Sequence, residues 1–237
     1  MAHRKFFSLL VLTSLLSAYA SCSSLEDHSI NVSSAMESQK SALTPTDDQK
    51  VNLTLNYETL NPDSAVFLVK DLKGVFDNDL ITILNLRLVP WGKAYTNKSD
   101  NATLCQNGPD ECYLNTIQAC AIDVWRVVDK HFGFIYCIEF LVIEGRHKEW
   151  QSCFSTWGLP QKPIMDCFNS GDGKKLEQKF GNETRHLSPP LEFVPWLVVN
   201  NQPIGKDYEN FAVYVCKAYK GSTVPKACQS VHWNPKT

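Results

Sequence analysis

Residues 51–89 read VNLTLNYETLNPDSAVFLVKDLKGVFDNDLITILNLRLV, and this stretch decides the fold class. Apolar and polar side chains alternate over 51–57, which predicts a half-buried strand. Apolar side chains recur at helical spacing over 68–79 and predict a helix with one buried face, whereas 80–89 reads as a second buried strand. A strand, a helix and a strand in this order form a βαβ unit, so we expect parallel strands joined by a right-handed crossover.

The rest of the chain predicts a helical region followed by a return to strands. Gly and Pro separate several helical segments within 111–185, and most of the cysteines lie in or just before this region. Strand character returns at 196–199, a turn follows at Asn200-Asn201, and a last helix is predicted over 207–219. The fold class is therefore α/β (α+β): a thioredoxin-like fold at residues 50–230 with a disulfide-bridged helical insertion at about 105–185.

The N-terminal residues predict entry into the secretory pathway. Arg4 and Lys5 precede an apolar run at 6–16 and a small-residue stretch at 17–20, the pattern of a signal peptide over residues 1–20. The run is shorter than the roughly 18 residues that span a bilayer, so no membrane partner is expected. Residues 21–49 lack a sustained period and are interpreted as a flexible tail or propeptide, and 231–237 as a C-terminal tail.

The charge balance argues against a nucleic-acid partner. The chain has 23 Lys and Arg against 25 Asp and Glu, and removal of the signal takes away two of the basic residues. An acidic protein of this kind has no electrostatic attraction for phosphate backbones. The histidines give no metal-ligand spacing, and no Gly-x-Ser-x-Gly turn occurs, so neither a metal site nor a serine hydrolase is predicted.

The cysteines predict a disulfide framework. Cys22 lies beside the cleavage point, and eight cysteines remain, an even number that suits an oxidising compartment and up to four bridges. Nearest-neighbour pairing is our expectation, although the sequence leaves other connectivities open. The expected bridges are Cys105–Cys112, Cys120–Cys137, Cys153–Cys167 and Cys216–Cys228.

Five Asn-x-Ser/Thr tripeptides predict a glycoprotein. The acceptor residues are Asn31, Asn52, Asn97, Asn101 and Asn182. Asn97 and Asn101 lie in a polar stretch that favours exposure, whereas Asn52 falls in a predicted strand.

One motif carries a family resemblance. Residues 105–120 read CQNGPDECYLNTIQAC. This string resembles the signature C-Q-H-G-x-x-E-C-x-x-N-x-x-x-x-C of the gamma-interferon-inducible lysosomal thiol reductase family, with Asn107 in place of the histidine. Residues 193–200, FVPWLVVN, resemble a second family segment, V-P-W-V-x-V-(N/D)-G, and the stretches at 207–211 and 216–221 look most like plant members.

The resemblance implies a soluble thiol reductase of lysosome-like or vacuolar compartments that reduces disulfides in protein substrates without a cofactor. The family's catalytic Cys-x-x-Cys follows the first strand, and the matching residues here are Asn61-Pro62-Asp63-Ser64. Thiol–disulfide exchange requires a thiolate to attack and a second thiol to resolve the mixed disulfide, and neither residue at the outer positions carries sulfur. Asn, Pro and Asp are instead well suited to start a helix.

The resemblance also implies a cis peptide bond at Val194-Pro195, where thioredoxin-type proteins bind extended substrate segments. We therefore expect Val194 and Pro195 to bind protein or extended peptide partners. Three hypotheses follow: a redox-silent binding protein, an oxidoreductase that acts through its other cysteines or through a partner that supplies thiols, or a protein with no catalytic or binding role. The sequence leaves the oligomeric state open.

Overall fold

The computed structural model describes residues 49–100 and 102–229. The predicted signal peptide at 1–20, Cys22, nearly all of the predicted N-terminal tail with Asn31, and the C-terminal tail at 231–237 lie outside the described residues, as does Asn101.

A four-stranded sheet forms the centre of the fold, in the order β2-β1-β5-β6. Strand β1 (Val51–Tyr57) pairs in parallel with β2 (Leu84–Pro90) along its whole length and antiparallel with β5 (Trp196–Val199). The edge strand β6 (Gln202–Pro203) pairs antiparallel with β5. This parallel pair with an antiparallel continuation confirms the predicted thioredoxin-like arrangement.

The crossover between β1 and β2 is a chain of short helical segments. It consists of α2 (Pro62–Val66), the π-helical η1 (Phe67–Leu72) and α3 (Gly74–Asp77). The prediction of a strand from residue 80 is wrong, because Leu80–Ile83 forms a 3-10 turn, η2, and β2 begins at Leu84. Asp79 has a left-handed backbone (φ 62°), and the Asn78 side chain accepts a hydrogen bond from the amide of Leu80, so the chain turns before it extends.

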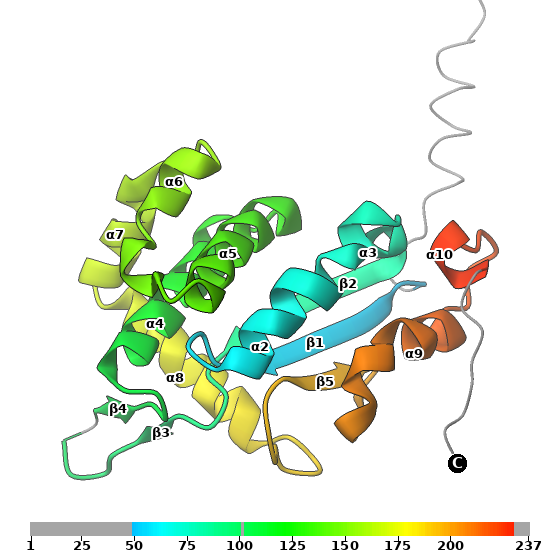
Figure 1. Cartoon of the computed structure of the whole chain (residues 1–237). Helices are drawn as coiled ribbons and strands as arrows, with labels where there is room; N and C mark the ends of the chain where they lie inside the picture. Colours follow the sequence, from blue (N-terminus) through cyan, green and yellow to red (C-terminus); the bar gives the residue numbers. More distant parts are fainter. Residues whose placement is uncertain (1–48, 101, 230–237) are drawn as a thin grey trace, which may run out of the picture. The chain divides into compact units, whose positions relative to one another are not determined.

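The insertion is helical, as predicted, and a small hairpin precedes it (Figure 1). The hairpin strands are β3 (Tyr95–Thr96) and β4 (Thr103–Leu104). The helices are α4 (Pro109–Val124), α5 (Val128–Ile143), α6 (Ser152–Thr156), α7 (Gln161–Asn169) and α8 (Asp172–Arg185). Helix α4 packs on α5, α7 and α8, whereas α5 also packs on α2 and η1.

The C-terminal part packs on the sheet. A 3-10 segment, η4 (Gly205–Asn210), leads into α9 (Phe211–Ala218), so the predicted last helix is present with a tighter first turn, and α10 (Lys226–Gln229) follows. The sheet, the crossover and α9 share one apolar cluster that includes Leu53, Leu55 and Phe67. A second cluster, with Phe134 and Ile138, lies among the insertion helices.

Four disulfides join the eight described cysteines, and two of the four expected pairings are wrong. Cys105–Cys112 and Cys216–Cys228 form as predicted. The other two bridges are Cys120–Cys167, between α4 and α7, and Cys137–Cys153, between α5 and α6. The short-loop argument fails because rigid helices set the pairing: Cys120 faces α7, which packs on α4, while the chain after α5 folds α6 back onto α5.

Candidate functional site

The tetrad Asn61-Pro62-Asp63-Ser64 begins a helix at the end of β1. Asn61 has an extended backbone, and its side-chain oxygen accepts a hydrogen bond from the amide of Ser64 at 3.0 Å. Pro62 occupies the first helical turn, and Asp63 adds the negative charge that this end of a helix favours. Asn61 is half-buried and Ser64 is buried. The predicted N-cap is thus confirmed.

The Val194-Pro195 peptide bond is cis, as predicted. Trp196, the next residue, pairs with Asn56 across the β1–β5 ladder, and its carbonyl accepts a hydrogen bond from the Asn56 side chain at 3.4 Å. This register places Pro195 at the end of the sheet where the tetrad begins. A second cis bond, Ser188-Pro189, was not predicted.

The signature motif supports the loop that leads to the tetrad. On α4, the Asn115 side-chain oxygen accepts hydrogen bonds from the Thr59 amide at 3.1 Å and from the Thr59 hydroxyl at 2.7 Å. The Glu111 carboxylate accepts from the Asn107 amide at 3.1 Å and from its side-chain nitrogen at 2.6 Å. Asn107, where the chain departs from the family motif, is therefore held by the motif's own glutamate. The motif fixes the backbone around the tetrad rather than supplying a reactive group.

Three buried glutamates lie behind this loop. Glu58 follows β1, Glu111 is on α4 and Glu139 is on α5, and each side chain is fully buried. The Glu58 carboxyl accepts a hydrogen bond from the Lys93 amide at 2.6 Å, but burial, with a further contribution from nearby Glu111, raises its pKa to about 7. Burial also raises the pKa of Glu139 well above the ordinary value.

A buried chain of hydrogen bonds connects β1 to α5. The Tyr57 hydroxyl donates to the Gln118 side chain at 2.5 Å, and Gln118 donates to Glu139 at 2.7 Å. Sequence reasoning missed these groups. The available signal was a glutamate or glutamine inside an otherwise apolar helical stretch.

Polar groups without a hydrogen-bond partner concentrate at the same place. Six buried side-chain atoms among the described residues lack a partner within the protein. They belong to β1, to the loop and tetrad that follow it, or to residues joined to these by hydrogen bonds or strand pairing. They are on Asn56, Glu58, Ser64, Asn115, Glu139 and Trp196. Natural proteins tolerate such unfavourable burial mainly at functional sites, which supports this end of the sheet as the candidate site.

The raised pKa of Glu58 predicts a stability that depends on pH. A carboxyl group whose pKa is higher in the folded state than in the unfolded state binds its proton more tightly when the protein is folded. Its contribution to stability is complete at pH values below the unfolded-state pKa. That contribution is lost as the pH rises through the folded-state pKa. For Glu58 the window runs from its ordinary value of 4.5 to about 7. We expect Glu58→Gln to match the wild-type free energy of unfolding near pH 4.5 and to exceed it by about 2 kcal/mol near pH 8, after allowance for solvent screening.

Urea unfolding of both proteins at several pH values measures this difference. Glu139 and the buried His131 also make stability depend on pH, and the lowered pKa of His131 acts in the opposite direction. Both residues are present in the wild type and in the variant, so the difference between the two proteins reports Glu58 alone. Glu111 and Lys93, the charged groups that act on Glu58, are unchanged in the variant. A difference that stays constant across pH would contradict the assignment.

The other predicted residues lie apart from this site. No group of His, Cys, Asp and Glu in the described part of the chain is arranged to hold a metal ion. Asn182 is exposed on α8, Asn97 accepts hydrogen bonds from Ser99, and Asn52 accepts one from Asn85. Glycosylation of these residues stays a prediction. Across residues 49–100 and 102–229, every helix is too short or too polar to cross a bilayer.

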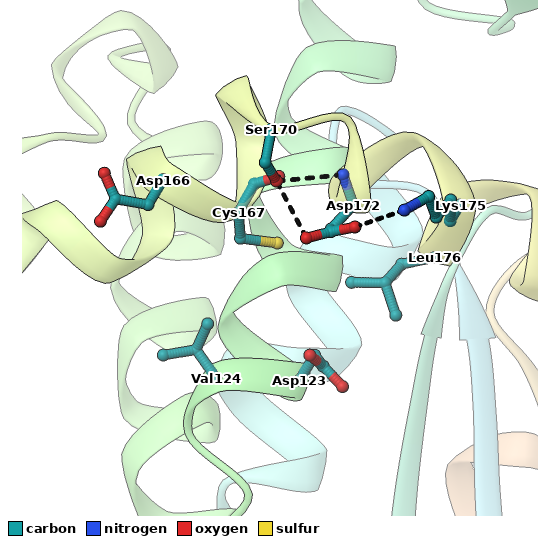
Figure 2. A pocket seen from close by; sticks show the side chains of 8 residues that line it. All are labelled: Asp123, Val124, Asp166, Cys167, Ser170, Asp172, Lys175 and Leu176. Carbon is teal, nitrogen blue, oxygen red and sulfur yellow. Dashed lines mark hydrogen bonds and ion pairs between the residues drawn. The ribbon is translucent and has the colours of Figure 1, made fainter.

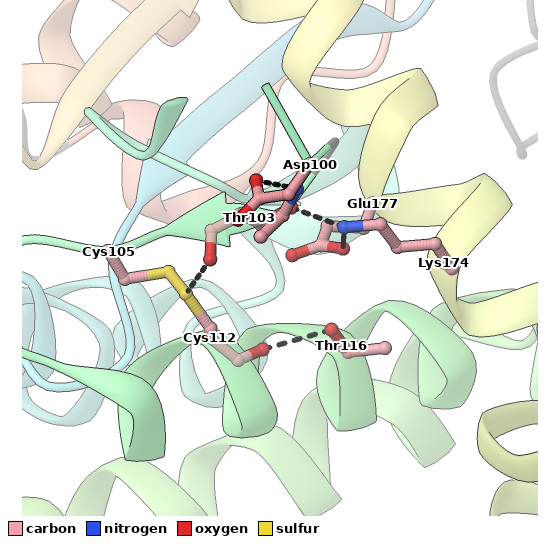
Figure 3. Close-up of polar contacts among 8 residues, drawn as sticks. Asp100, Thr103, Cys105, Cys112, Thr116, Lys174 and Glu177 are labelled. Atoms are coloured by element: carbon pink, nitrogen blue, oxygen red, sulfur yellow. Dashed lines mark hydrogen bonds and ion pairs between the residues drawn. A yellow bond between two sulfur atoms is a disulfide. The ribbon is translucent and has the colours of Figure 1, made fainter. Parts of the chain in front are cut away.

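Two surface pockets of the insertion do not include the tetrad. The first, about 520 Å³, lies beside Cys167 where α4, α7 and α8 meet, and Asp172 there pairs with Lys175 and Ser170 (Figure 2). The second, about 360 Å³, lies beside Cys112 of the Cys105–Cys112 bridge (Figure 3). Its polar wall is formed by Lys174, which donates to the Thr103 hydroxyl at 2.6 Å and pairs with buried Glu177 at 3.0 Å.

A solved structure supports the thioredoxin-like fold. The solved structure of oxidised BdbD from Bacillus subtilis aligns with a TM-score of 0.50 and 13% sequence identity, covering 74% of this chain and 91% of that one. The chain thus has a thioredoxin-like fold with a helical insertion.

Sequence comparisons then define the family. The profile described as "Gamma interferon inducible lysosomal thiol reductase (GILT)" matches residues 52–157. The chain is 40% identical over 186 residues to the gamma-interferon-responsive lysosomal thiol protein of Arabidopsis thaliana, with 76% of each chain covered. It is 31% identical over 192 residues to the mouse gamma-interferon-inducible lysosomal thiol reductase, covering 78% of this chain and 75% of that one. The chain belongs to the gamma-interferon-inducible lysosomal thiol reductase family.

Proposed function

We propose that this chain is a redox-silent member of its family, which binds protein or extended peptide segments beside Pro195 and the start of α2. In this proposal the protein is a glycoprotein of the secretory route, located outside the cell or in a lysosome-like or vacuolar compartment. The family's catalytic Cys-x-x-Cys corresponds to the tetrad at 61–64.

The observation that carries the proposal is the cap at the start of α2. A reductase needs a thiolate here, and the free amides of the helix end lower the pKa of that thiol. In this chain the Asn61 side chain already accepts the hydrogen bond of the Ser64 amide. Ser64 is buried, and its hydroxyl has no basic partner that could activate it. The start of α2 is therefore stabilised by a side-chain cap, and it carries no nucleophile.

The backbone beside Pro195 supports the binding role. Strand β6 pairs only with Val198 and Val199, and the amide of Ile204 bonds to Leu197. No described residue forms a backbone hydrogen bond with Val194. The backbone of Val194 is therefore without a backbone partner in the described part of the chain, although the residue is buried, and an extended segment that reached it could pair with it by β-strand addition.

The alternative is a retained oxidoreductase activity through another cysteine pair. Cys105 and Cys112 are half-buried, and Cys112 borders a pocket, so their bridge (Figure 3) is more accessible to exchange than Cys120–Cys167, where Cys120 is fully buried. Their spacing is not that of a thioredoxin-type pair, and a bridge of this kind is structural by default in an oxidising compartment.

Two measurements on the wild-type protein decide between these functions. We expect insulin-reduction turbidity at pH 5 and pH 7 to stay at the level of a heat-denatured control. A thiol titration of the native, unreduced protein should find none of the eight described cysteines free, before and after mild reductant. Turnover of insulin, or release of the Cys105 and Cys112 thiols by mild reductant, would favour the oxidoreductase.

A further inference from the structure

A groove lined by aromatic side chains lies at the α3 end of the crossover, whereas the tetrad begins its α2 end. It has a volume of about 450 Å³ and lies between α3, α5 and the end of α6. We call it the aromatic groove and define it by Phe76, Phe132, Tyr136 and Trp157. The rings of Phe76 and Phe132 stack with centroids 4.3 Å apart, and Tyr136 follows one turn along α5.

Trp157 forms one wall of the aromatic groove because Gly133 has no side chain to occupy the space that the Trp157 ring fills. A Cβ atom added at Gly133 would lie 2.7 to 2.9 Å from the Trp157 ring, closer than real contacts allow. The Cys137–Cys153 bridge fixes α6, and the Trp157 amide bonds to the Cys153 carbonyl at 3.2 Å. Trp157 is nevertheless 47% exposed. A large apolar ring is thus held in a fixed place and left open to solvent.

The aromatic groove has one more negative than positive side chain in its lining. Lys73, Asp77 and Asp129 are its charged lining residues. Lys73 and Asp77 form an ion pair with each other. No described basic residue forms an ion pair with Asp129, which lies exposed in the first turn of α5. An apolar, aromatic surface with an unneutralised carboxylate complements a cation with an apolar body.

We propose that the aromatic groove binds a small organic cation, an amine or quaternary ammonium compound that carries an aromatic or aliphatic group. Its charged nitrogen would lie near Asp129 and the ring faces, and its apolar body would lie between Trp157 and the Phe76–Phe132 pair. The residues of the aromatic groove are separate from the tetrad and from Pro195, so this site is independent of the proposed peptide-binding function.

The chain's own N-terminal region is a poor occupant. After the predicted signal, residues 21–48 contain five acidic residues and one lysine. Such a segment would bring negative charge towards Asp129, and like charges are unfavourable at close range. A separate cationic molecule therefore fits the groove better.

Three probes of similar size and different charge test the proposal by calorimetry at pH 7: phenethylamine, 2-phenylethanol and 3-phenylpropionate. Fragments of this size should bind with a Kd on the order of 1 mM. We expect phenethylamine to bind about tenfold more tightly than the alcohol, and phenylpropionate to bind most weakly. Equal affinities for the three probes, or no binding of phenethylamine at tens of millimolar, would overturn the proposal.

Variants assign the binding to this groove. Asp129→Asn should remove most of the preference for the cation, whereas Asp123→Asn, a matched change of an exposed aspartate on α4, should leave it unchanged. Trp157→Ala should weaken all three probes at least about fivefold, and because Trp157 is exposed the fold should persist. Gly133→Ala should act like Trp157→Ala by displacing the ring. Unchanged phenethylamine binding in Trp157→Ala would place the probe elsewhere and refute the assignment.

Discussion

Replacing Asn61 and Ser64 together by cysteine is expected to raise disulfide-reductase activity at least about 100-fold over wild type. Loss of a catalytic nucleophile lowers kcat by on the order of 10⁶ in a well-studied serine protease, so a 100-fold gain is a modest expectation. The scaffold is in place: the tetrad starts a helix, Val194-Pro195 is cis, and Asn115 supports the preceding loop. A cysteine at position 61 would meet the amide that Asn61 now caps. Insulin turbidity at pH 5 and pH 7 measures the gain.

The two single substitutions are the matched controls. Asn61→Cys should form a mixed disulfide with a disulfide-bearing client but not release it, because no second thiol resolves the bond. Ser64→Cys should stay inactive, since its side chain is buried beneath the helix start. If the double variant folds and remains as inactive as the wild type, the claim that the site differs from a reductase only by its missing sulfurs is wrong.

Gly92→Ala is expected to lower the free energy of unfolding by about 3 to 5 kcal/mol. Gly92 has φ +57°, and a Cβ atom there would lie 2.2 Å from Cγ and 2.6 Å from Oε1 of Glu58. Left-handed strain adds about 1 to 2 kcal/mol, overpacking about 1 to 3, and the displaced carboxyl would also lose its hydrogen bond from the neighbouring Lys93 amide. The total is a large share of the roughly 5 to 15 kcal/mol that stabilise a typical domain. Urea unfolding at pH 5 measures it.

Gly145→Ala is a control that separates the cost of left-handed backbone strain from the cost of the contact with Glu58. Gly145 has a similar backbone (φ +69°), but nothing lies within 4 Å of its would-be Cβ atom. We expect it to lose only about 1 to 2 kcal/mol. Equal losses at the two positions would mean that Glu58 can move away without penalty, and would weaken the case for a rigid loop before the tetrad.

The sequence predicted the βαβ unit well because its signals are local. Alternation over 51–57 gave the position of β1, the residue types at 61–63 gave the start of α2, and the family resemblance gave the cis bond at Pro195. Asn78 and Asp79 carry the signal for the turn before β2, but the apolar residues Leu80 and Ile83 outweighed it. These two are buried in a 3-10 turn as they would be in a strand.

Features that depend on packing between distant elements could not be predicted. The pairing of Cys120 with Cys167 requires knowing that α4 lies against α7, which no local pattern encodes. The burial of Glu58, Glu111 and Glu139 has the same origin, because charged side chains are expected at the surface until the fold brings them together. The aromatic groove combines residues from three elements and has no motif.

The Cys137–Cys153 bridge has a practical consequence for anyone who produces this protein. It ties α6, the short helix just before Trp157, to α5, so the wall of the aromatic groove depends on correct oxidation. Protein made in a reducing cytosol would lack this bridge, so α6 and Trp157 would no longer be tied to α5 and the aromatic groove would be deformed. Expression through an oxidising export route, with mass spectrometry of this one cross-link, is therefore the quality criterion for any screen against the groove.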